Sequence, residues 1–466
     1  MPPNIPLIND RSVLWFVSEL HLLFAAFVLG APIFIVFCEF LGLRTKDGRY
    51  ERLARETMKI VAISYSLTAL FGAAMTFVLV GRYQVFSNFL FQHFYPVFGM
   101  YALLLVVETG LMYTYWYTWD ALMQKKALHI SIGLGLNIVG LVVMALMNGV
   151  GSFMLTPPDA PATASLWQMM NNATWTGLNL HRFIANISFG GFMVALFAAL
   201  MYFTSRNDKD RAFYDWMGYI GNFIGVAALI LLPVAGYIYT KEIFAYNAQI
   251  STLLMADKLA WFFVIQGVLV GLLLLGAMFY MWLSIRRIEG GVRFQAYFRG
   301  AFWIILVGLI VWLIPQSFLP SLTTRPSGPI TSVTIPEKAI FLGLMPAKGL
   351  AVSAMVVVTA FVYFLYRQAI STGKMVWGQI DIKAQLVLIL LPSLAVFTMA
   401  LMGPVRELAR GQWHIFQFMP DTTLYNFTTP LGYTAIMSGI ITIVFFLLMF
   451  GIFWLGFRVG HQDEEQ

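Results

Sequence analysis

Charged residues are scarce in this sequence. Asp, Glu, Lys and Arg together make up 11% of its 466 residues, and hydrophobic residues make up 59%. A soluble globular chain carries roughly 25% charged residues, so neither a soluble enzyme nor a disordered protein fits. The 29 Lys and Arg exceed the 22 Asp and Glu, but the excess is spread over short connections. A nucleic-acid partner, which needs clustered basic residues, is therefore excluded.

Cysteine and nucleotide-binding motifs are almost absent. The single cysteine, Cys38, lies within an apolar run, which excludes disulfides and thiolate metal sites. No C-x-x-C-H motif occurs, so no c-type haem is attached covalently, and no glycine-rich phosphate loop is found. No polar stretch is long enough to form a separate nucleotide-binding domain.

What the sequence does contain is long apolar runs, each of about the 20 residues that cross a bilayer as a helix. They predict an all-α polytopic membrane protein, a bundle of about eleven transmembrane helices. A membrane barrel would show short alternating segments instead. The runs are 13–42, 58–81, 94–117, 128–154, 179–204, 217–240, 259–285, 300–320, 338–366, 384–404 and 433–457.

The basic residues predict the orientation. Nineteen of the 29 Lys and Arg lie in the odd-numbered connections and the C-terminal tail, against eight on the other side. Because cytoplasmic loops are enriched in Lys and Arg, we expect the N-terminus outside and the C-terminus in the cytoplasm.

Ionisable residues inside spans are costly and indicate function. Five spans bring His, Met, Glu, Lys and Arg to one depth near the outer side. Each also has a structural interpretation: a lone His can bond a neighbouring helix, a Met can fill the core, and Glu with Arg can form an interfacial ion pair. We take His129, which begins the fourth span on the inner side, as structural. The residues at the outer depth are His21, Met100, Glu108, His181, Arg182, Met345, Lys348, Glu407, Arg410, Trp413 and His414.

Histidine and methionine at one membrane depth favour a haem-like redox site. Imidazole and thioether together make a low-spin electron-transfer pair on haem iron. Sites for closed-shell metals are less favoured, because carboxylates are few and thiolates are absent.

Four segments resemble subunit I of the cytochrome bd quinol oxidases: SELHLLFAAFVLGAPIFIVFCE, LNLHRFIANISFGGFMVALF, LMPAKGLAVSAM and VRELARGQW. The resemblance implies that His21 ligates a haem of the active-site pair. It assigns His181 and Met345 to a low-spin b haem and Glu407 to a high-spin b haem. Arg410, Trp413, Glu108 and His414 are then expected to support the haem sites.

The sequence also departs from the family pattern. Met100 stands eight residues before Glu108, where the family has a second glutamate at the haem d site. A haem held by His21 and Met100 would be six-coordinate and poorly suited to O₂. The stretch GYIYTKEIFAYNAQ is short where the family has a long quinol-binding loop, and it offers Lys241 and Glu242 as quinol contacts.

The resemblance predicts four parts: a haem-binding six-helix bundle (1–240), a short outer loop as candidate quinol site (241–258), two extra spans (259–320), and a three-helix C-terminal part with the second haem ligand and the E-x-x-R-x-x-W loop (321–466).

We expect a bacterial inner-membrane cytochrome that oxidises quinol through two or three haem b groups, with haem d as an alternative cofactor. Its expected partners are a second membrane subunit, the quinone pool and a periplasmic c-type cytochrome as acceptor. The alternative is a divergent bd-type quinol:O₂ oxidase. A haem-free transporter is the third, least favoured class.

Overall fold

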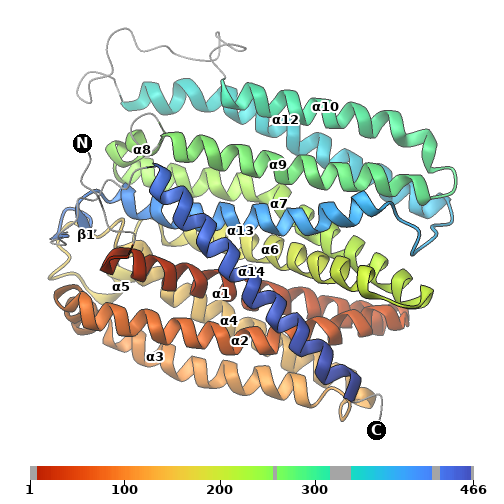
Figure 1. The fold of residues 1–466 in the computed structure, drawn as a ribbon. Coiled ribbons are helices and arrows are strands. Elements are labelled where there is room, and N and C mark those ends of the chain that lie inside the picture. Colours follow the sequence, from red (N-terminus) through yellow and green to blue (C-terminus); the bar gives the residue numbers. More distant parts are fainter. Residues whose placement is uncertain (1–7, 256–259, 315–336, 422–430, 463–466) are drawn as a thin grey trace. The chain divides into compact units, whose positions relative to one another are not determined.

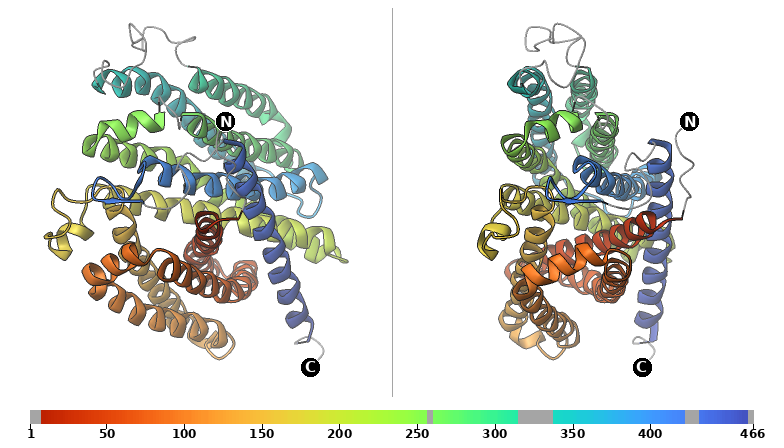
Figure 2. Two further views of the ribbon diagram at one scale, coloured as in Figure 1. Left: turned by 60° about the vertical axis from the view of Figure 1, so that its left-hand side comes forward. Right: turned by 90° about the vertical axis from the view of Figure 1, so that its left-hand side faces the viewer.

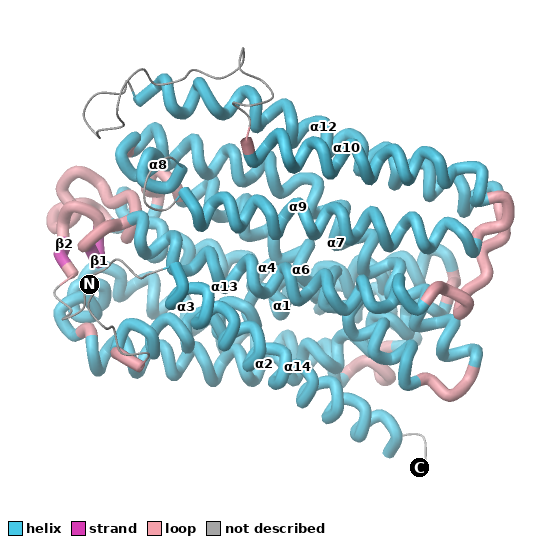
Figure 3. Tube along the Cα trace, turned by 45° about the horizontal axis from the view of Figure 1, so that its top comes forward, coloured by secondary structure: helices cyan, strands magenta, loops and turns pink. Residues whose placement is uncertain are grey.

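The structure is a computed structural model that describes residues 8–255, 260–314, 337–421 and 431–462. Helices account for almost all of these residues, and a single short strand pair occurs among them (Figure 3). Eleven helices in the described part are long and apolar enough to cross a membrane. The predicted helical fold class and number of spans are therefore confirmed.

The chain divides into two compact units. Unit 1 comprises residues 1–191 and 399–466, and unit 2 comprises residues 192–398. The divisions fall inside α6 (Trp175–Thr204) and α13 (Ile382–Ala409), so each of these helices belongs partly to both units. This division differs from the four parts expected from the resemblance, which stay a prediction.

Unit 1 holds the N-terminal helices and the last helix of the chain (Figure 1). In its most apolar window α1 is 67% buried, against 11% for α2, so α1 is a central helix and α2 a peripheral one. The elements, besides parts of α6 and α13, are α1 Asp10–Thr45, α2 Gly48–Arg82, α3 Gln84–Tyr117, η1 Met123–Lys125, α4 Lys126–Phe153, α5 Leu166–Met170, β1 Trp413–Ile415, β2 Met419–Pro420 and α14 Leu431–Gln462.

The chain reverses between α1 and α2 within two residues. Lys46 ends α1 with a left-handed φ of 58°, and the Asp47 carboxylate accepts the Arg49 N–H at 3.0 Å to begin α2. Such caps satisfy main-chain groups that a helix end leaves open. The result is a tight hairpin in which α1 and α2 lie side by side (Figure 2).

Helices α1 and α6 meet in unit 1 through two glycines. A Cβ on Gly30 would lie 1.9 Å from the carbonyl oxygen of Asn186, and a Cβ on Gly190 would lie 2.9 Å from the Ala31 nitrogen. No side chain fits between these backbones, which is how small residues let membrane helices approach closely.

Unit 2 contains a bundle of helices with a buried ion pair. Asp215 of α7 and Arg287 of η2 form the pair, and the Gly378 N–H donates to the same carboxylate at 2.8 Å. The Trp377 ring lies 4.8 Å from the guanidinium. The elements, besides parts of α6 and α13, are α7 Asp208–Tyr246, α8 Ala248–Met255, α9 Ala260–Ser284, η2 Ile285–Arg287, η3 Gly291–Phe294, α10 Gln295–Leu313 and α12 Glu337–Thr372.

The sequence predicts an outer loop at 241–258. The described residues of this segment are helical instead. Helix α7 continues to Tyr246, and α8 begins at Ala248. Asn247 between them has an extended backbone, and its side chain accepts the Gln249 N–H at 2.9 Å. One polar residue thus ends one helix and caps the next.

Candidate functional site

His21 lies on α1 in unit 1, and its ring packs against α2. Nδ1 donates a hydrogen bond to the main-chain carbonyl of Thr68 at 2.9 Å, because a carbonyl can only accept. A Cβ on Gly72 would lie 3.0 Å from the ring. The proton is therefore on Nδ1 and the lone pair is on Nε2, the tautomer in which an imidazole binds a metal through Nε2.

Glu19 is a buried carboxylate on the same helix. It is 4% exposed and lies so close to α13 that a Cβ on Gly403 would be 1.5 Å from its Oε1. The charged groups that act on it are Arg182, Arg406 and Glu407. Helices α1, α6 and α13 thus bring acidic and basic groups together inside unit 1.

A series of amide hydrogen bonds fixes Arg182. Its Nη1 donates to Asn148 Oδ1 at 2.8 Å, and Asn148 Nδ2 donates to Asn179 Oδ1, also at 2.8 Å. Asn179 in turn donates to the Trp175 carbonyl at 3.0 Å. These bonds join α4 to the start of α6, the turn that also carries the half-buried His181.

Two arginines of unit 1, Arg406 and Arg410, lie at the end of α13 and directly after it. Arg406 donates to the main-chain carbonyl of Gly151. Arg410 is 8% exposed, and its Nη2 lies 3.8 Å from Glu407 Oε1, while its buried Nε has no acceptor. Burial lowers the pKa of the Arg410 guanidinium to about 10, against the opposing effect of Glu407. This buried cation therefore has an unused donor, a feature suited to an anionic ligand.

The β1–β2 hairpin closes the same end of unit 1, which we call the hairpin end. Asp421 forms an ion pair with Arg11 of α1, and its Oδ1 lies 3.4 Å from His414 Nε2. The His414 ring also contacts Tyr83 and Phe86, with ring centroids 5.6 and 5.2 Å away. Burial lowers the pKa of His414, with Asp421 opposing, and burial raises the pKa of Tyr83.

Glu108 and Met100 lie on α3, beyond a kink at Phe94 that precedes Pro96. Glu108 is 4% exposed, and a Cβ on Gly140 of α4 would lie 3.0 Å from its Oε1. Met100 is 50% exposed. Eight residues turn a helix by about 80° from its starting direction, so the two side chains share a face only loosely.

The remaining predicted residues lie elsewhere. Trp413 is the half-buried first residue of β1 in unit 1. Lys241 and Glu242 lie on α7 in unit 2, Lys241 exposed and Glu242 half-buried. Lys348 of α12 lies over the Trp312 ring, with Nζ 4.6 Å from its centroid. The side chain of Met345 falls outside the part of the chain that is described.

Four of the residues that the sequence predicts for the site come together in unit 1: His21, Arg182, Glu407 and Arg410. The sequence interpretation missed Glu19 and Arg406. The rule that flags an ionisable residue within an apolar run applies to Glu19 as fully as to His21. In the sequence, Arg406 is only one of the basic residues in a connection between spans.

A haem fits these residues better than a bare ion does. The described residues hold no group of three or more His, Cys, Asp or Glu that could bind a metal ion. A haem iron takes only one or two protein ligands, since the porphyrin supplies the others. The free lone pair of His21 suits the iron, and the unused Nε donor of Arg410 suits a propionate.

Comparison with protein families matches residues 10–250 to cytochrome bd terminal oxidase subunit I. The matched segment is more than half of the chain. The chain belongs to this family. Membership makes it a haem-binding oxidoreductase of respiratory electron transport that works with quinol, and a multi-pass protein of the bacterial inner membrane.

A solved structure supports the fold. The chain is similar to the structure of bd oxidase from Geobacillus thermodenitrificans, with 14% sequence identity and a TM-score of 0.56. The likeness covers 98% of this chain and 99% of that chain. No match is found among curated proteins.

Proposed function

We propose that this chain is the haem-carrying subunit of a quinol-oxidising respiratory complex. The observation that carries the proposal is His21, whose Nδ1–H is fixed by the Thr68 carbonyl so that Nε2 can ligate iron. His21 lies within the segment that matches the family.

The hairpin end of unit 1 would face the outside. The opposite end, which we call the basic end, carries the α1–α2 and α3–α4 connections with Arg44, Lys46, Arg49, Lys125 and Lys126. Basic connections are retained in the cytoplasm, which supports an N-terminus outside and a C-terminus inside.

Bound haems would supply one-electron redox chemistry. In this proposal His21 and Glu407 each hold one haem, and His181 with Met345 holds a low-spin b haem. Arg410 would bind a propionate, because its buried guanidinium has a donor to spare. The type of the haem at His21, b or d, is decided by the spectrum below.

Quinol would bind near Lys241 and Glu242 at the end of α7. Oxidation of a quinol releases protons, and a carboxylate can accept one of them. We assign the role of proton acceptor to the half-buried Glu242. The exposed Lys241 would contact the bound quinol. A second membrane subunit would complete the complex, since the matched family is subunit I of an oxidase.

The electron acceptor depends on coordination at the His21 iron. Membership of a terminal-oxidase family supports O₂, which requires an open iron position. Met100, at the position of a family glutamate, supports a closed iron and transfer to a periplasmic c-type cytochrome; the comparisons lend that partner no support. We therefore place O₂ first and the c-type cytochrome second.

The test is a dithionite-reduced optical spectrum of the purified complex before and after carbon monoxide. A band that shifts with carbon monoxide supports the oxidase. Low-spin bands without a shift support the second acceptor, provided that Met100→Leu then opens the iron. If His21→Ala leaves every haem band unchanged, or if the purified complex stays haem-free after haem supplementation, the proposal fails.

A further inference from the structure

A cluster of buried polar side chains lies inside unit 2, and the proposed function uses none of them. Six of them come from four helices and are 0% exposed: Asp215 and Asn222 of α7, Tyr280 and Ser284 of α9, Tyr366 of α12 and Gln385 of α13. Arg287 of η2, the partner of Asp215, has a side chain that is 4% exposed. Polar groups buried this deeply in a membrane protein need hydrogen-bond partners.

The ion pair of Asp215 and Arg287 is the centre of the cluster. Arg287 Nη2 donates to Ser284 Oγ at 2.9 Å, and Ser284 shares a further hydrogen bond with the Tyr366 hydroxyl. Tyr280, one turn before Ser284 on α9, lies within the electrostatic reach of both charges. Helices α7, α9 and α12 thus present polar groups to one region of unit 2.

Gln385 belongs to the same region. The Gly378 N–H, just before α13, donates to Asp215 at 2.8 Å, so α7 and α13 begin at the same end of unit 2. A Cβ on Gly218 of α7 would lie 2.9 Å from Leu388 Cδ1 of α13. Asp215 and Gln385 each lie three residues before these two contacting positions. Because residues three apart share a face of a helix, Gln385 faces α7 at the level of Asp215.

Helix α9 reaches the same part of α13. A Cβ on Gly276 would lie 2.9 Å from Leu391 Cδ2. Tyr280 is four residues nearer to the ion pair than Gly276, and Gln385 is six residues nearer to it than Leu391. Since a helix rises about 1.5 Å per residue, Tyr280 and Gln385 lie within one turn of each other along the bundle.

Six side-chain atoms of this cluster have no hydrogen-bond partner among the described residues. Asn222 uses only its amide nitrogen, which donates to the Tyr363 hydroxyl at 3.4 Å, and Gln385 uses neither end of its amide. The six atoms are Asp215 Oδ1, Asn222 Oδ1, Tyr280 Oη, Arg287 Nε, Gln385 Oε1 and Gln385 Nε2.

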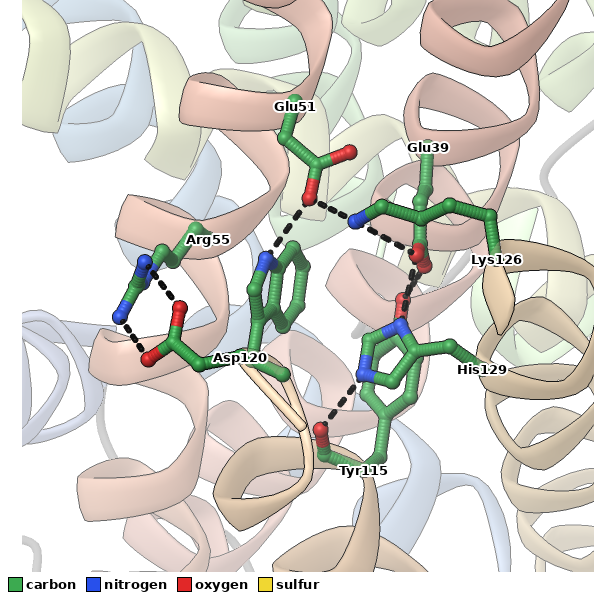
Figure 4. A network of polar contacts seen from close by, with 8 residues as sticks. Glu39, Glu51, Arg55, Tyr115, Asp120, Lys126 and His129 are labelled. Carbon is green, nitrogen blue, oxygen red and sulfur yellow. Dashed lines mark hydrogen bonds and ion pairs between the residues drawn. The ribbon is translucent and has the colours of Figure 1, made fainter. Parts of the chain in front are cut away.

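The buried polar cluster at the basic end of unit 1 has no such unpaired atoms (Figure 4). There the Tyr115 hydroxyl donates to Glu39 Oε2 at 2.6 Å, and His129 Nδ1 lies 2.6 Å from Glu39 Oε1. His129 Nε2 donates to the Tyr115 carbonyl at 2.8 Å. The polar side chains of that cluster satisfy one another, so the unpaired atoms of unit 2 are a property of their own site.

The chemistry of the unpaired atoms selects the ligand. A bare cation would satisfy only the carboxylate and amide oxygens, and an anion would satisfy only the Arg287 and Gln385 N–H groups. The charges of Asp215 and Arg287 already balance each other. The ligand must therefore be neutral and must both donate and accept, as water does. A buried water makes about three hydrogen bonds, so six unpaired atoms suit about two or three water molecules.

We propose that unit 2 binds a cluster of water molecules between α7, α9, α12 and α13. The waters accept from Arg287 Nε and the Gln385 amide nitrogen, and they donate to the oxygens of Asp215, Asn222 and Gln385. By completing the hydrogen bonds of both charges, they keep the buried pair ionised inside the membrane. No covalent bond changes, and the waters act as a structural ligand of unit 2.

The experiment is X-ray hydroxyl-radical footprinting of the purified complex, read by mass spectrometry of the tyrosine-containing peptides. The pulse makes radicals from any water molecule, including a bound one, so a buried ring beside bound water is oxidised although bulk solvent does not reach it. We expect Tyr280 to be oxidised severalfold faster than Tyr115. The two are matched, because both are 0% exposed, but the Tyr115 hydroxyl is paired with Glu39. Equal rates for the two tyrosines would overturn the proposal.

Gln385→Leu gives a second, independent outcome. In a hydrated site the substitution takes a donor and an acceptor from the waters, so oxidation of Tyr280 should slow and the unfolding temperature should not rise. In a dry site it would replace an unpaired amide by an apolar side chain of similar size, which stabilises a protein. A higher unfolding temperature with an unchanged oxidation rate of Tyr280 therefore refutes the water cluster. Gln368→Leu, at an exposed position of α12, is the control and should change neither quantity.

Discussion

The imidazole of His21 donates its Nδ1 proton to the main-chain carbonyl of Thr68 at 2.9 Å, so a backbone group of α2 fixes the tautomer of a histidine on α1. No substitution can remove that carbonyl. The ring can be moved, however, because Gly72 on α2 lies directly against it.

Gly72→Ala is therefore expected to weaken haem binding at His21. The added Cβ would lie 3.0 Å from Cε1 and 3.1 Å from Nδ1, so the ring must shift by a few tenths of an ångström. Displacing a ligand histidine from the hydrogen bond that orients its ring costs metal affinity of the order of 10-fold. Haem content and the reduced spectrum measure it. Gly81→Ala on the same helix meets nothing within 4 Å and is the control; equal haem loss in both variants would contradict the prediction.

Arg410→Gln should lower the midpoint potential of the nearest haem. Removing a buried positive charge destabilises the reduced, more negative state, and an interaction of about 1.4 kcal/mol corresponds to about 59 mV for one electron. Redox titration of the purified complex measures the shift. Arg55→Gln, which removes an exposed guanidinium at the basic end, should leave all potentials unchanged. A potential that Arg410→Gln does not change would place the propionate elsewhere.

Asp215→Asn should destabilise unit 2 by about 3–5 kcal/mol. The Arg287 side chain is 4% exposed, so loss of its partner leaves a buried charge uncompensated. Thermal unfolding of the solubilised protein measures the effect. Asp208→Asn, on the same helix but fully exposed and 3.9 Å from Arg211, should leave the unfolding temperature almost unchanged. Comparable losses for both would show that the buried pair contributes no more than a surface one.

The hairpin end should lose stability in acid because of His414. Burial lowers its pKa in the folded state, so the unfolded chain binds a proton more readily. The stabilisation is complete above the unfolded pKa of about 6.5 and decreases as the pH falls through the window between the two pKa values. Thermal unfolding at pH 7.5 and pH 5 should show a smaller acid-induced loss in His414→Asn than in the unsubstituted chain. An identical loss in both would exclude His414 as the cause.

The spans could be predicted because each is a local property of about 20 residues. The ends of the helices could not: α7 begins at Asp208, nine residues before the predicted span, since a membrane helix can continue into water through polar residues. The chain is helical in the described part of the predicted loop at 241–258, because one capping residue, Asn247, suffices between α7 and α8.

The candidate residues near the outer side could be predicted, because the depth of a residue in the membrane follows from its position in the span. Contacts between helices that are distant in sequence could not be predicted in this way. The sequence predicts a structural role for His129, but its hydrogen-bond partner Glu39 lies 90 residues away, and only the packing of α1 on α4 joins the two. Glu39 itself reads as an ordinary residue near a helix end. The pairing of His181 with Met345 stays a prediction.

Helix α14, which follows all other described helices in the chain, packs on the first two helices of unit 1, with the Phe445 ring 4.9 Å from the Phe24 ring. The core around α1 is therefore incomplete until the residues of α14 have been synthesised. Any cofactor that requires the finished unit must be inserted after α14 has been synthesised. A truncation anywhere before residue 431 would remove α14, and its defect would be seen in maturation, as accumulated apoprotein, before any change in electron transfer could be measured.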